Sequence, residues 1–198
     1  RRRANFYEAL SFQLRVLNLI RVQPELGKIW KVQSEIAVLF EQLELPDQAR
    51  SNNIDAVESA KQAGTPLDIA ATQIQFAGFL NDYGVEESEP TRLLIEAALP
   101  VIRSEGTIPQ LSSALLQAGR NQLSLANLAQ AQSYFESALT LATQAQSQAL
   151  IAHIQFRQGE LALTQGNAKA ALAKVESAQS GYEAQRNRPR LQIGRAHV

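Results

Sequence analysis

FESAL at residues 135–139 matches IEAAL at residues 95–99 and VESAQ at residues 175–179. The alanines of the three segments lie at positions 98, 138 and 178, so the same step of 40 residues occurs twice. A fixed internal period of this size is typical of repeat proteins, in which each structural unit packs only on its neighbours. The period therefore predicts an array of similar units over this part of the chain.

Small residues recur at fixed distances before these alanines. Thr91, Ala131 and Ala171 stand seven residues upstream, and Gly119 and Gly159 stand nineteen residues upstream of the last two. Small side chains let two helices cross closely, whereas overpacking such a crossing costs about 1–3 kcal/mol. The spacing predicts closely packed pairs of helices.

One copy of the pattern is complete enough to compare with a known family. Gly159, Gly166, Ala171, Val175 and Ala178, with the corner Thr164-Gln165-Gly166-Asn167, resemble a tetratricopeptide repeat (TPR). The copy before it matches at Gly119, Ala131, Phe135 and Ala138, and a looser copy matches at Ala37, Phe40, Ala49, Asn53 and Ala56. Between them Gly78 matches, but residues 85–90 replace the usual short turn. Phe6-Tyr7-Glu8-Ala9 resembles the second helix of a repeat whose first helix is missing.

The resemblance covers roughly residues 30–184, with two departures. The family's usual period is about 34 residues, so a period of 40 implies longer helices. The family's aromatic residue beside the glycine is replaced by Gln155 in the last copy and by Ala114 or Leu115 in the copy before it. HEAT-like or other helical hairpin arrays remain an alternative.

The resemblance implies an all-α fold, a right-handed α-solenoid of antiparallel helix pairs. Hydrophobic periodicity and the positions of the prolines predict helices at residues 4–22, 27–43, 47–63, 67–83, 90–104, 108–123, 127–144, 147–164 and 167–184, with a bend at Pro100. Residues 1–26 are expected to be the second helix of a truncated repeat plus a connector, and residues 27–184 about four TPR-like hairpins. Residues 185–192 are expected to be a tail.

Both ends suggest a fragment of a longer protein. The chain has no methionine, begins with Arg1-Arg2-Arg3, and enters an apolar helical pattern at once, so we expect an N-terminus cut within structure. Residues 193–198, IGRAHV, can be encoded by ATC GGA AGA GCA CAC GTC, which matches the start of a widely used sequencing adapter. We expect these residues to be read-through rather than native sequence. A native tail is the alternative.

Composition argues against several classes of protein. Nineteen basic and nineteen acidic residues give a formal net charge of zero, which does not favour nucleic-acid binding. No apolar run approaches the roughly 18 residues that a membrane-spanning helix needs, and no signal-peptide pattern is visible, so a cytoplasmic location is expected. The absence of cysteine excludes disulfides and thiolate metal sites.

The sequence offers no constellation for catalysis. His153 is the only histidine outside residues 193–198, so the predicted native part has no pair of histidines for a metal. No serine lies in a Gly-x-Ser-x-Gly context, and no phosphate-binding or dinucleotide-binding glycine motif is present. We therefore predict no catalytic residue, no cofactor and no metal. Trp30 is expected to pack in the core rather than to anchor a partner.

The TPR resemblance implies a concave face, lined by the first helix of each pair, that binds a protein or peptide. Transferring the family's groove positions selects Lys31, Ser34, Glu41, Gln42, Thr72, Gln75, Asp82, Ser113, Arg120, His153 and Glu160. These residues carry charges of both signs and lack the cluster of Lys and Arg that would hold a peptide carboxylate.

Two functions follow from this face. The first is a protein–protein interaction scaffold, and the alternative is a regulatory or sensor arm of a larger bacterial signalling or transcription-regulating protein. An enzyme within these residues is disfavoured because no catalytic constellation is visible. Apolar surfaces at the ends of the stack also predict self-association.

Overall fold

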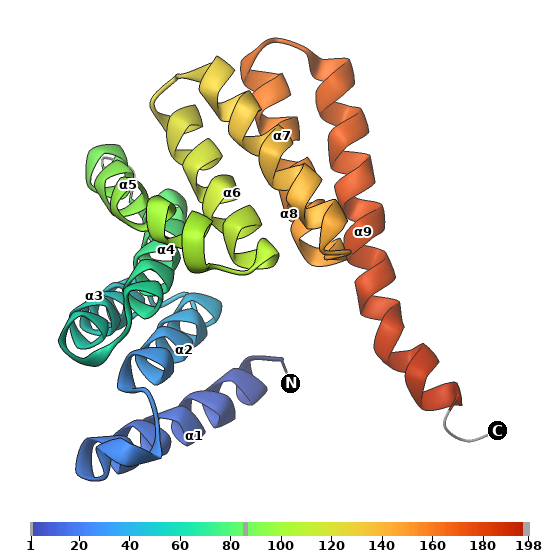
Figure 1. Ribbon diagram of the computed structural model, residues 1–198. Helices are drawn as coiled ribbons and strands as arrows, with labels where there is room; N and C mark the ends of the chain where they lie inside the picture. Colours follow the sequence, from blue (N-terminus) through green and yellow to red (C-terminus); the bar gives the residue numbers. More distant parts are fainter. Residues whose placement is uncertain (1, 85–86, 196–198) are drawn as a thin grey trace. The chain divides into compact units, whose positions relative to one another are not determined.

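The computed structural model describes the backbone of residues 2–84 and 87–195, and the side chains of residues 4–25, 27–84 and 87–184. Within these residues the chain is helical apart from short connections, and it contains no strand. It divides into two compact units, Arg1–Glu105 and Gly106–Val198, whose helices are labelled in Figure 1. The predicted all-α solenoid of antiparallel helix pairs is confirmed.

The first unit contains two helix pairs and one additional helix. Its elements are α1 (Arg2–Val22), the 3-10 helix η1 (Pro24–Leu26), α2 (Ile29–Gln42), α3 (Pro46–Ala63), α4 (Pro66–Tyr83) and α5 (Ser88–Glu105). The helices α2 and α3 form one antiparallel pair, and α4 and α5 form the next. The packing of α1 on α2 is less extensive than the packing within either pair, and it is as extensive as that of α3 on α4.

The core of this unit begins between α1 and α2. Buried Leu10, Leu17 and Ile20 of α1 meet buried Val32 and Ile36 of α2. On α1 these apolar residues are spaced about one helical turn or two apart, which places them on one side of the helix. The other side of α1 keeps large apolar residues exposed, including Phe12 and Leu19.

The second unit contains the two pairs that carry the 40-residue step. Its helices are α6 (Ile108–Ser124), α7 (Leu128–Gln144), α8 (Gln148–Thr164) and α9 (Ala168–Arg195). The pairs are α6–α7 and α8–α9, and α7 packs on α8. A Cβ atom added to Gly119 would lie 2.5 Å from Cε1 of Phe135, so glycine is required where α6 crosses α7. The predicted role of the small residues is confirmed at this crossing.

The same type of hydrogen-bonded turn follows four of the described helices. After α2, α6, α7 and α8 the chain turns through a left-handed residue, and an N–H beyond it donates to a carbonyl in the last turn. This is the Schellman arrangement, which satisfies carbonyl groups that the helix leaves unpaired. The left-handed residues are Glu44, Ala126, Gln146 and Gly166. Gly166, with φ of 77°, confirms the predicted turn, whereas Ala126 shows that the equivalent corner forms without glycine.

The observed helices agree with the predicted ranges except at the C-terminal end. The last helix, α9, continues to Arg195, so the backbone of residues 185–192, where a tail was expected, is helical. In Figure 1 this red helix runs well past the end of α8. The predicted read-through segment lies partly in α9, and residues 196–198 lie outside the described residues. Trp30 is 8% exposed and belongs to the core, as predicted.

Candidate functional site

An apolar groove opens in the first unit between three helices. It has a volume of about 400 Å³. Its lining consists of Ala9, Phe12 and Gln13 of α1, Ser34, Glu35, Val38 and Leu39 of α2, and Gln75 of α4. We call this feature the α1–α2 groove. Two of the residues predicted to contact a partner, Ser34 and Gln75, lie in it.

Two hydrogen bonds tie the walls of the groove together. Nε2 of Gln75 donates to the carbonyl oxygen of Ser34 at 2.7 Å and thereby joins α4 to α2. Nε2 of Gln13 donates to Oε2 of Glu35 at 2.7 Å and joins α1 to α2 at the exposed rim. Both bonds cross between helices and so link the three helices that form the walls.

The floor and rim of the groove are mainly apolar. Phe12 is 64% exposed and Val38 is 42% exposed, although burying either apolar side chain would be energetically favourable. Exposed apolar surface that is rimmed by polar groups is a common mark of an interaction site. The polar groups here are one carboxylate, on Glu35, and the amides of Gln13 and Gln75. This combination favours binding of an apolar segment with a few polar contacts.

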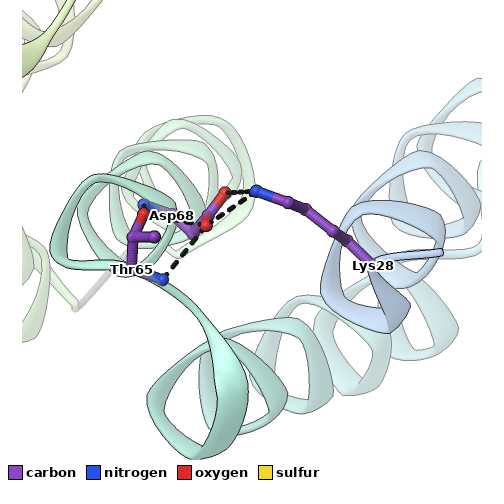
Figure 2. A network of polar contacts seen from close by, with 3 residues as sticks. All are labelled: Lys28, Thr65 and Asp68. Carbon is purple, nitrogen blue, oxygen red and sulfur yellow. Dashed lines mark hydrogen bonds and ion pairs between the residues drawn. The ribbon is translucent and has the colours of Figure 1, made fainter. Parts of the chain in front are cut away.

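A polar network joins the N-terminal ends of α2 and α4, which are the first helices of the two pairs in this unit. Nζ of Lys28, just before α2, lies 2.9 and 3.0 Å from the carboxylate oxygens of Asp68 in the first turn of α4. Thr65 caps α4 through two hydrogen bonds. The backbone N–H of Asp68 donates to the Thr65 hydroxyl, and the Asp68 carboxylate accepts from the Thr65 backbone N–H at 3.1 Å. Figure 2 shows Lys28 and the backbone nitrogen of Thr65 both directed at the Asp68 carboxylate. The network sets the distance between α2 and α4 at one end.

The charge of Asp68 is strongly stabilised by this network. Burial alone would raise the pKa of the Asp68 carboxyl. The hydrogen bonds from Lys28, from the backbone and hydroxyl of Thr65, and from Trp30 outweigh that effect and lower the pKa to about 2. Lys28 also lies over the Trp30 ring, 5.4 Å from its centroid. Asp68 therefore stays ionised at neutral pH and fixes the Lys28 ammonium group.

The other ends of α2 and α4 carry acidic groups instead. Burial, together with the nearby charge of Asp82, raises the pKa of Glu41, although a hydrogen bond from Asn53 opposes the shift. Burial and the charges of Glu41, Asp82 and Glu44 raise the pKa of the Tyr83 hydroxyl. The helices α2 and α4 therefore have an ion pair at their N-terminal ends and acidic groups at their C-terminal ends.

The remaining predicted positions of the first unit vary in exposure. Lys31 and Gln42 are exposed on α2, and Asp82 is exposed on α4. Thr72 is only 6% exposed, and its hydroxyl donates to the carbonyl oxygen of Ile69 at 2.8 Å. Thr72 therefore belongs to the packing of α4, and its hydroxyl already has an internal acceptor.

The predicted positions of the second unit lie on α6 and α8. Ser113, His153 and Glu160 are half-buried. Arg120 is 6% exposed, and its guanidinium donates to Oε1 of Gln117 at 3.0 Å. These residues offer less accessible surface than the α1–α2 groove does.

Glu160 accepts two hydrogen bonds from Nη1 of Arg157, at 3.0 and 3.1 Å. The same guanidinium lies over the ring of Phe156, 5.4 Å from its centroid. Arg157 was not among the predicted residues, although its position three residues before Glu160 on the same helix is the signal that indicates such a pair.

Sequence reasoning also missed the residues that give the groove its apolar character, Phe12, Val38 and Leu39. In the residues that the structure describes, no group of three or more His, Asp or Glu side chains is arranged to hold a metal ion. In the same described part of the chain, no helix is sufficiently long and apolar to cross a membrane.

Many solved structures resemble the chain, and three of them illustrate the likeness. BtubC (BKLC) from P. vanneervenii is 18% identical with a TM-score of 0.67, and the match covers 92% of this chain and 75% of that one. A Rap protein complexed with Competence and Sporulation Factor is 15% identical with a TM-score of 0.72. That match covers 92% of this chain and 51% of the Rap chain, so the chain spans about half the length of Rap. MamA is 12% identical with a TM-score of 0.54, and 94% of each chain is covered.

No model of a known protein family matches the sequence. No curated protein matches it either. At these identities the three structures show the fold alone. They are TPR-like helical repeat proteins, and the chain shares that fold with them.

Proposed function

We propose that the chain is a protein–protein interaction module and that the α1–α2 groove is its main contact surface. The observation that carries the proposal is an apolar groove of about 400 Å³ whose lining helices are joined by hydrogen bonds. Phe12 and Val38 present apolar surface there, while Glu35 and Gln75 supply polar contacts. Burying such a centre within a polar rim is how most protein interfaces gain affinity.

The predicted groove residues of the first unit fit this proposal as flanking contacts. Ser34 and Gln75 lie in the groove, and Lys31, Gln42 and Asp82 are exposed on the same two helices. In the second unit we propose a separate polar contact patch at Ser113, His153 and Glu160, whereas Arg120, like Thr72, is 6% exposed and belongs to the packing of its helix. The function is binding rather than catalysis, with a protein or peptide partner.

Site-specific photocrosslinking tests the proposal with a matched control. Val38 in the groove and Ile54 on α3 are both 42% exposed, so a photoreactive phenylalanine at either position is equally accessible. We expect the probe at Val38 to form covalent adducts with other proteins in cells that express the chain, and the probe at Ile54 to form none. Identical adducts from both positions, or adducts from Ile54 alone, would contradict the assignment.

A regulatory arm within a longer bacterial protein is the second candidate. It is favoured by the match to Rap, which covers about half of that chain and whose structure holds Competence and Sporulation Factor. Recovering the parent gene and sequencing beyond residues 1 and 191 separates the two candidates. An adjoining catalytic or DNA-binding domain would favour the regulatory arm, and further helix pairs alone would favour the scaffold.

A further inference from the structure

We draw no further inference here: the strongest candidate, the exposed apolar face of α1 beside the α1–α2 groove, carries none, because nothing in the part of the chain that the structure describes shows what covers it.

Discussion

The helices α1 and α7 carry the same pair of residues, a phenylalanine followed three positions later by an alanine, in different surroundings. In α7 both Phe135 and Ala138 are fully buried, because α6 covers one side of the helix and α8 the other. In α1 the corresponding Phe6 and Ala9 are half-buried, since among the described helices of its unit only α2 packs extensively on it. The same two residue types are thus more deeply buried in α7, which is packed by α6 and α8, than in α1.

Truncating the phenylalanines tests this difference with the largest expected effect. Phe135→Ala removes a fully buried ring and should lower the free energy of unfolding by about 3–5 kcal/mol. Phe6→Ala removes a ring that packs on one side only and should cost about 1–2 kcal/mol. Urea unfolding followed by circular dichroism measures both. Equal losses would mean that α1 and α7 are covered to the same degree.

Replacing Gly119 and Gly159, the two glycines that lie 40 residues apart, with alanine sharpens the comparison at the helix crossings. In Gly119→Ala the new Cβ would lie 2.5 Å from the buried Phe135 ring, so we expect a loss of about 1–3 kcal/mol. In Gly159→Ala the nearest atoms are Cγ2 of Val175 at 3.0 Å, on a side chain that is 37% exposed and able to move, and the carbonyl oxygen of Ala171 at 3.3 Å. The gain in helix propensity, up to about 1 kcal/mol, offsets part of this milder crowding, so Gly159→Ala should cost less than Gly119→Ala.

The double variant Gly119→Ala with Phe135→Leu serves as the control for this pair. The smaller side chain makes room for the methyl group, so the two changes should cost less together than the sum of their separate costs. Strict additivity would show that the cost of Gly119→Ala does not come from the Phe135 ring.

The smallest effect concerns the network that spaces α2 and α4 in the unit of α1. Because the pKa of Asp68 is lowered from 3.8 to about 2, its contribution to stability is complete above about pH 4 and is lost as the pH falls through 2. The Lys28 partner is more than half exposed, so the contribution should be at most about 1 kcal/mol.

Urea unfolding followed by Trp30 fluorescence at pH 4.5 and about pH 2.5 measures this contribution. Asp68→Asn lacks the titrating group and provides the baseline, so the wild-type chain should lose more stability than this variant over the interval. An identical loss in both proteins would show that Asp68 is not stabilised by the fold.

Much of the fold was predictable because the determinants are small residues at fixed spacing. Gly119 and Ala138 report a close helix crossing directly, since any larger side chain would clash there. The corner at Gly166 was predictable because glycine favours a left-handed residue. Ala126 in the equivalent corner shows that the hydrogen bonds of the corner impose this conformation even without glycine.

The end of α9 was not predictable from the same signals. A tail was expected over residues 185–192, yet the helix continues through them to Arg195. The four corners each turn at a left-handed residue, and no residue directly after Ala184 takes that conformation. An interior proline removes one helix hydrogen bond and usually kinks or breaks a helix, so Pro189 gave no indication that α9 continues past it.

The groove was only partly predictable. Ser34 and Gln75 followed from the family's first-helix positions, because those positions are set by the helix pair. Phe12 and Val38 did not, since a single sequence does not distinguish an apolar residue that remains exposed from one that is buried by a neighbouring helix. That distinction depends on which helices surround α1, which is a property of the packed unit.

Hydrogen–deuterium exchange tests most directly whether α1 is packed by fewer neighbours than α7. The amides of residues 6–13 in α1 should exchange faster than those of residues 135–142 in α7, which lie between two neighbours. Equal protection of the two segments, or faster exchange in α7, would contradict the account.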